Sequence, residues 1–270
     1  MPLVRGIRLR VDNLGMSLSD LFLARLSELN SLGLRPDTSD VVCPDSTPVL
    51  FFGELERADV VTVGINPSWQ EFRTIAHQPL PRGCRRFAHL SDLTGEEKRD
   101  AELALATMRD YFRPESNAYW PWFNHVERVV NALGSSLKDG TAAHTDILSC
   151  FATDPTWGRL KPASVKAHLS RSGYKTFLRV IQSVPKLRLV ILFGGTARRS
   201  LETRAHCVFT RVPTPFDHLP KFAMFQPVLS TAKWTVGERT VTALAVGPYR
   251  SAPASPMSRE EVEMIPRLLM

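Results

Sequence analysis

The sequence contains few cysteines, and none of them lie close together. The four are Cys43, Cys84, Cys150 and Cys207, and no C-x-x-C pair occurs. Zinc knuckles and iron–sulfur clusters usually take their ligands from closely spaced cysteines, so neither kind of metal site is expected. We expect reduced thiols that are mostly buried.

Long hydrophobic runs are missing as well. No stretch approaches the roughly 18 consecutive apolar residues of a membrane span, and arginines interrupt the N-terminal segment before a signal-peptide core could form. These absences predict a cytoplasmic protein with no membrane partner. No internal repeat, low-complexity tract or linker separates two halves, so we expect one domain over residues 1–270 and a monomer.

Positive charge exceeds negative charge in this chain. Its 34 Lys and Arg residues stand against 27 Asp and Glu residues, which gives a formal net charge of +7. Such an excess favours a polyanionic partner, although many basic proteins bind no nucleic acid. The hydrophobic content of 43% is ordinary for a folded domain.

Apolar segments alternate with helical patterns along most of the chain. The predicted strands are 60–63, 144–151, 187–195 and 240–248, and the predicted helices are 17–33, 96–112, 120–134, 162–184, 196–204 and 258–270. Near-continuous apolar strands that alternate with helices indicate an α/β fold with a parallel sheet covered on both faces. The first helix belongs to an N-terminal helical segment, 1–40.

One segment, 205–239, fits this alternation badly. It is rich in proline and carries stretches such as VPTPFDHLPKF. We expect it to be a long, insertion-like excursion that lies near the binding face.

Polar or small residues mark the end of each predicted strand. In a parallel sheet these positions meet at one edge, where ligands bind. The uncharged amide of Asn66 is unusual because it lies just past a strand of β-branched residues that ends at Val63. The four strand ends are Gly64 to Ser68, Asp146 with Ser149, Gly194 to Thr196, and Gly247 to Ser251.

The order and content of these strand ends resemble the uracil-DNA glycosylase superfamily. GINPS resembles the GINPG or GMNPG motif of its mismatch-specific and single-strand-selective branches, with Ser68 in place of the last glycine. HTDILSCFATDP is similar to the TNxVKCxPP strand, and ILFGGTARRSL is similar to the LLGxxA strand and helix. The resemblance spans residues 60–264. It implies a three-layer α/β/α sandwich around a four-stranded parallel sheet, DNA as partner, and no metal or organic cofactor.

The resemblance also implies roles for residues of the first motif. Asn66 would bind the water that attacks C1′ of the deoxyribose, because hydrolysis of an N-glycosidic bond needs a well-placed water more than a strong nucleophile. The alternative is a turn residue that hydrogen-bonds its own loop. Ile65 and Ser149 would line the base pocket. Phe87 would stack on the flipped base, with Phe72 as a competitor and a core position as the alternative.

Asp146 departs from the family pattern, which has Asn at this position. An ionised carboxylate only accepts hydrogen bonds, so it suits the N4 amine of cytosine and opposes O4 of uracil. The resemblance with this departure implies a monofunctional glycosylase for a modified cytosine, such as a prokaryotic antiphage defence enzyme would need. The structural alternative is that Asp146 caps a neighbouring loop.

The last strand end departs further, because the His-Pro-Ser of most family members is absent. Stabilisation of the departing base would then come from protonated Asp146, from backbone N–H groups, or from His144 or His218. The predicted DNA contacts are Pro67, Ser68, Gly247, Pro248, Tyr249, Arg250 and Ser251, with Arg82, Arg85 and Arg86 as further phosphate contacts or a solvated face. Repair of uracil or hypoxanthine, and a non-catalytic DNA-binding relative, stay open as alternative functions.

Overall fold

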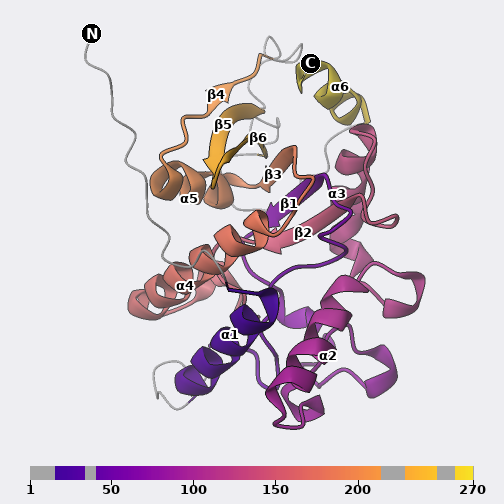
Figure 1. Cartoon of the computed structure of the whole chain (residues 1–270), viewed down its shortest axis with the longest axis vertical. Coiled ribbons are helices and arrows are strands. Elements are labelled where there is room, and N and C mark those ends of the chain that lie inside the picture. Colours follow the sequence, from indigo (N-terminus) through magenta and orange to yellow (C-terminus); the bar gives the residue numbers. More distant parts are fainter. Residues whose placement is uncertain (1–15, 34–40, 214–228, 248–258, 270) are drawn as a thin grey trace.

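The structure is a computed structural model that describes residues 16–33, 41–213, 229–247 and 259–269 (Figure 1). It is an α/β fold built on one mixed sheet of six strands, in the order β2-β1-β3-β6-β5-β4. The strands are β1 Val60–Gly64, β2 Ala142–Asp146, β3 Leu189–Phe193, β4 Thr210–Arg211, β5 Ser230–Val236 and β6 Arg239–Val246.

The predicted four-stranded parallel sheet is therefore wrong in strand number and in strand direction. The four predicted strands are present as β2, β1, β3 and β6, and neighbours among them pair parallel. Two further strands, β5 and β4, extend the sheet with antiparallel pairing. Both lie in 205–239, so this segment is partly sheet rather than an excursion, and its middle, 214–228, lies outside the described residues.

A local pattern explains why β5 joins the sheet. Along β5, buried residues alternate with more exposed ones, and Ala232, Trp234 and Val236 face the interior. This period of two is typical of an antiparallel strand with one buried face. Gly237, at φ +59°, lies in the two-residue turn that joins β5 to β6.

Helices cover both faces of the sheet. They are α1 Leu18–Gly33, α2 Glu97–Arg109, α3 Trp120–Ala132, α4 Ala163–Gln182, α5 Gly195–Ala205 and α6 Arg259–Leu269. The chain passes from β1 through α2 and α3 to β2, crosses back through α4 to β3, and continues through α5 to β4, β5 and then β6. Helix α3 lies on one side of the sheet, and α4 and α5 lie on the other, as Figure 1 shows. Helix α6 packs against α3.

The loop after β2 runs beside the loop after β1 instead of continuing the predicted strand. Backbone N–H groups of Ile147 and Leu148 donate to the carbonyls of Gly64 (3.2 Å) and Ile65 (2.9 Å). On the other side, α4 approaches so closely that a Cβ at Gly173 would overlap the backbone of Leu148. This packing holds two strand ends together.

Within the described ranges, no helix is long and apolar enough to cross a membrane.

Candidate functional site at the carboxyl edge of the sheet

The ends of the parallel strands meet in two adjoining pairs. Gly64 at the end of β1 pairs in register with Asp146 at the end of β2. Beyond β3, Gly194 donates its N–H to Val246 O of β6 (3.0 Å), and Gly247 lies beside Gly194. The predicted DNA contacts Pro248, Tyr249, Arg250 and Ser251, and the alternative histidine His218, lie outside the described residues.

The Asn66 side chain is held in one orientation. Its Nδ2 donates to Pro67 O (2.8 Å) and to Thr153 Oγ1 (3.0 Å). A carbonyl oxygen accepts only, so the amide nitrogen must face Pro67. In the described part of the chain no partner is found for Asn66 Oδ1, which keeps its capacity to accept a hydrogen from a water or a ligand.

Other residues of the first motif support this turn. Pro67 is buried, and Ser68 Oγ accepts from Gln70 N (3.2 Å), which caps a short 3-10 helix, Trp69–Glu71. Thr153, which sequence reasoning did not single out, also pairs with Ser68 in an isolated parallel bridge. Its only signal in the sequence is its place in the same FATDP segment that resembles a family motif.

The Asp146 carboxyl lies in the interior, 6% exposed, beside a buried histidine. His144 Nε2 lies 3.7 Å from Asp146 Oδ1, and His144 Nδ1 lies 2.9 Å from Thr62 Oγ1. A Cβ on Gly64 would overlap Asp146 Oδ1, so glycine at this position leaves room for the carboxyl. Burial raises the pKa of Asp146, and the neighbouring His144 offsets part of that rise.

A second buried carboxyl, Glu71, was missed by sequence reasoning. It is 3% exposed, and Tyr111 Oη donates to its Oε2 (2.6 Å) while Tyr119 N donates to Tyr111 Oη (3.0 Å). Burial raises the pKa of Glu71 to about 7, although the Tyr111 hydrogen bond and the charge of Arg86 lower it. The charge of Asp146 raises it further, so the two carboxyls are electrostatically linked.

The predicted base pocket is closed in this conformation. Phe87 is 1% exposed and stacks on Tyr111 at 4.9 Å, and its competitor Phe72 is completely buried. Ser149 is also buried, and its Oγ accepts from Phe151 N (2.9 Å). A base could reach Phe87 or Ser149 only if neighbouring side chains moved. Ile65, by contrast, is half-buried beside Asn66.

A partly exposed aromatic pair also lies near Asn66. The ring of Trp69 stacks on His77 with centroids 4.3 Å apart, and His77 Nδ1 lies 2.9 Å from Asp154 Oδ2. Asp154 directly follows Thr153, the partner of Asn66. This pair offers a ring surface that sequence reasoning did not consider.

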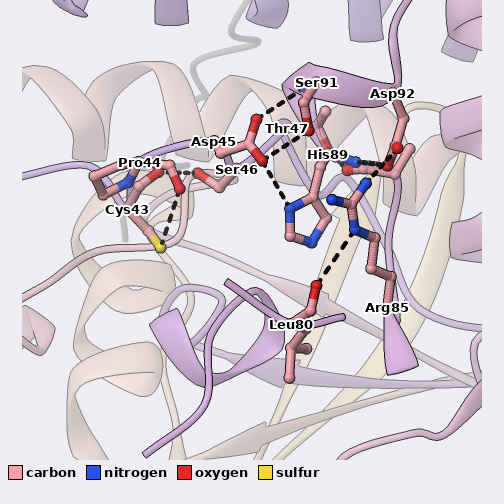
Figure 2. Close-up of polar contacts among 11 residues, drawn as sticks. Cys43, Pro44, Asp45, Ser46, Thr47, Leu80, Arg85, His89, Ser91 and Asp92 are labelled. Atoms are coloured by element: carbon pink, nitrogen blue, oxygen red, sulfur yellow. Dashed lines mark hydrogen bonds and ion pairs between the residues drawn. The ribbon is translucent and has the colours of Figure 1, made fainter. Parts of the chain in front are cut away.

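A polar cluster fixes the segment that carries Phe87 (Figure 2). Asp45 accepts from His89 Nδ1 (3.0 Å) and from the N–H (2.8 Å) and hydroxyl (2.9 Å) of Ser91. Arg85 pairs with Asp92 and donates through Nε to Leu80 O (3.4 Å). The cluster joins residues 43–47 to residues 80–92, which restricts movement of Phe87.

The three arginines predicted to contact phosphates differ in their surroundings. Arg85 is paired with Asp92, and Arg86 donates to the backbone carbonyls of Gln70 (2.6 Å) and Asn117 (2.8 Å). Arg82 is exposed, and the described residues provide no partner for its guanidinium. Arg82 is therefore the arginine best placed for an external anion.

Neither a metal cluster nor a known relative identifies the site. No group of three or more His, Cys, Asp or Glu side chains among the described residues could hold a metal ion. A scan against models of protein families gives no match, and a search of curated proteins finds no relative. The chemistry of this edge therefore has to be argued from its own residues.

Proposed function

We propose that this protein is a monofunctional DNA glycosylase that flips a base and hydrolyses its N-glycosidic bond to leave an abasic site. The observation that carries this proposal is the fixed amide of Asn66. Its two hydrogens are used within the protein and its Oδ1 is left as an acceptor at the carboxyl edge of the sheet. The four parallel strands β2-β1-β3-β6, with helices on both faces, supply the layered frame that such a fold requires.

The Asn66 amide can position a water molecule, but it is too weakly basic to deprotonate one. Hydrolysis of an N-glycosidic bond passes through an oxocarbenium-like state, so the gain comes mainly from a water held in line with C1′. Asn66 Oδ1 accepts one hydrogen of that water and leaves an oxygen lone pair free to attack. No lysine is matched to a Schiff-base role, so strand cleavage is not part of the proposal.

The proposed substrate is a modified cytosine-type base in DNA, as in antiphage defence. The Asp146 carboxyl supports this choice, because it can accept from an exocyclic amine. Uracil or hypoxanthine repair is the second candidate, supported by the raised pKa of Asp146, which favours a protonated carboxyl that can donate to a base carbonyl. A DNA-binding protein without activity is the third.

DNA would approach the surface around the first motif. Residues 72–80 form a hairpin closed by a bridge between Arg73 and Pro79, and Ile75 at its tip is 84% exposed. An exposed apolar side chain beside a base-flipping site can wedge between base pairs. Arg82, close in sequence, offers a phosphate contact.

The test is incubation of the purified protein with duplexes that each contain one defined base, followed by alkali to cleave at abasic sites. Mass spectrometry of the released base identifies the substrate, and Asn66→Ala is the matched inactive control. Release of a modified cytosine by wild type alone supports the proposal. Binding of every duplex with no base released from any of them favours the non-catalytic relative.

A further inference from the structure

We propose that the outer face of α4 and α5 is a second DNA-binding surface, which holds the phosphate backbone of duplex DNA beside the carboxyl edge of the sheet. This basic surface consists of Arg171 and Lys175 on α4 with Arg199 and Arg204 on α5. The choice of DNA as the partner rests on the proposed function. The binding itself can be measured without any base release.

The sequence concentrates positive charge in this part of the chain. Residues 155–201 contain ten Lys and Arg residues and no Asp or Glu. Outside this stretch, 27 acidic residues outnumber 24 Lys and Arg residues. The net positive charge of the protein therefore comes from the segment that carries α4 and most of α5.

The charges on α4 are not balanced as they are on another surface helix, α2. Helix α2 carries three acidic and three basic residues, whereas α4 carries four Lys and Arg residues and no acid. The acid on α5, Glu202, pairs with Arg198 of the same helix (2.8 Å). Cations without matching carboxylates repel one another and destabilise a helix, so an anionic partner accounts for their place on one surface.

Contacts between the two helices bring these cations together. Arg204 donates to the hydroxyl of Ser170 on α4, and its guanidinium lies over the ring of Tyr174, 5.1 Å from the centroid. Arg171 directly follows Ser170 in α4. Burial lowers the pKa of Arg204, and the positive charge of Arg171 contributes to this shift while Tyr174 opposes it. Two arginines from different helices therefore lie near each other.

The basic surface is open to solvent. Arg171, Lys175 and Arg199 are exposed, and α4 and α5 lie on the same side of the sheet (Figure 1). Arg171 and Lys175 are one helical turn apart, so they lie on one face of α4. No carboxylate in the described segments pairs with any of the four cations. Their charges can therefore take an external anion.

The basic surface adjoins the candidate site. Gly173 lies between Arg171 and Lys175 in α4, on the opposite face of the helix. A Cβ at Gly173 would lie 2.2 Å from Leu148 O, just past the end of β2. Helix α5 begins directly after β3, at the same carboxyl edge. A duplex that is bound at this edge can therefore continue over α4 and α5.

The chemistry of this face favours a nucleic acid over an anionic membrane. A helix that binds at a membrane surface inserts apolar side chains among the lipids. On α4, the large apolar side chains Leu169, Phe177 and Val180 are buried, and none of the exposed large apolar side chains in the described segments lies on this helix. Arginine and lysine side chains are common partners of DNA phosphates.

Fluorescence anisotropy over a range of salt concentrations tests the basic surface, with a duplex of about 30 base pairs that contains only ordinary bases. A variant with Arg171→Gln, Lys175→Gln and Arg199→Gln removes three exposed charges. We expect the slope of log affinity against log salt concentration to fall by about three. The matched control, with Lys98→Gln, Arg99→Gln and Arg109→Gln, removes the same charge from α2, and its slope should fall by less than one unit.

Several outcomes would overturn the basic surface. They are equal slopes for the two variants, no binding of the duplex by wild type, and a loss of binding to phosphatidylserine vesicles with DNA affinity unchanged. Base release together with equal slopes would refute the surface and leave the glycosylase function in place. A fall in slope with no base released from any duplex would refute the glycosylase function and leave the surface in place.

Discussion

At the scale of single residues, the site consists of side chains whose polar atoms are almost all committed. Asn66 uses both amide hydrogens, His144 uses Nδ1, and Glu71 accepts from Tyr111. The atoms left over are Asn66 Oδ1, which is an acceptor, and Asp146 Oδ2, for which the described residues provide no partner. Substitutions at Asn66 and Asp146, which carry these atoms, are therefore expected to change base release or base selectivity.

Asn66→Ala should abolish base release and leave DNA affinity within a few-fold of wild type. The substitution removes the acceptor that places the water, but no predicted phosphate contact. Single-turnover rates and gel shifts on the same duplex measure the two effects separately. Undiminished base release would show that Asn66 is only a turn residue.

Asp146→Asn should weaken release of cytosine-type bases and permit uracil. The amide can donate as well as accept, and one well-placed hydrogen-bond pair is worth roughly 1–3 kcal/mol of discrimination, or about tenfold or more in the ratio of rates. Mass spectrometry of bases released from paired oligonucleotides gives that ratio. If wild type releases uracil readily and cytosine derivatives not at all, the cytosine assignment is wrong.

Glu71→Gln should remove a pH dependence of stability. The carboxyl has a pKa raised from 4.5 to about 7 in the folded protein. Its contribution to the free energy of unfolding is therefore complete below pH 4.5 and is lost as the pH rises to 7. The loss amounts to about 3 kcal/mol at most. Urea unfolding at pH 5 and pH 8 should show wild type losing stability relative to Glu71→Gln, and Glu102→Gln, on the exposed face of α2, should behave as wild type.

At the scale of elements, the alternation of apolar and helical segments predicted the parallel strands and the helices between them. The prediction missed β5. The prolines elsewhere in 205–239 indicated an irregular segment, although the buried Ala232, Trp234 and Val236 alternate with more exposed residues. That pattern, followed by the turn at Gly237, was sufficient to predict a hairpin with β6. The close contact of α4 with the loop after β2 has no such signal, because it depends on the absence of one side chain.

Gly173→Ala should therefore destabilise the protein despite the better helix propensity of alanine. Its Cβ would overlap the backbone of Leu148 and Ser149, and overpacking of this kind costs about 1–3 kcal/mol. Gly83→Ala is the control, since nothing lies within 4 Å of a Cβ there. Denaturant unfolding compares the two variants, and equal midpoints would contradict the close contact.

At the scale of the whole molecule, the net charge of +7 predicts association with a polyanion. Fewer arginines are available for this association than the net charge suggests, because many of them bond to other groups of the protein. Arg85 and Arg86 are two examples. The predicted contact Arg250 lies outside the described residues. Among the described residues, Arg82 is an exposed arginine close in sequence to the first motif, with no partner for its guanidinium.

Arg82→Ala should lower the salt dependence of DNA binding. The logarithm of affinity should fall linearly with the logarithm of salt concentration, and loss of one phosphate contact should reduce the slope by about one. Fluorescence anisotropy over a range of salt concentrations measures the slope. Lys186→Ala, at the opposite edge of the sheet, should leave the slope unchanged, and equal slopes for both variants would place Arg82 away from DNA.

The sequence by itself determined the α/β class, four of the six strands and the position of Asn66 at a strand end, because these follow from local periodicity and from the turn after Gly64. Only the tertiary structure decided what these residues touch. Asn66 bonds to Thr153, 87 residues away, and Glu71 bonds to Tyr111, 40 residues away. The protonation state of the Asp146 carboxyl depends on its burial and on His144. The parallel register pairs Asp146 with Gly64 and His144 with Thr62. Strand pairing and packing set such distances, so no local pattern encodes them.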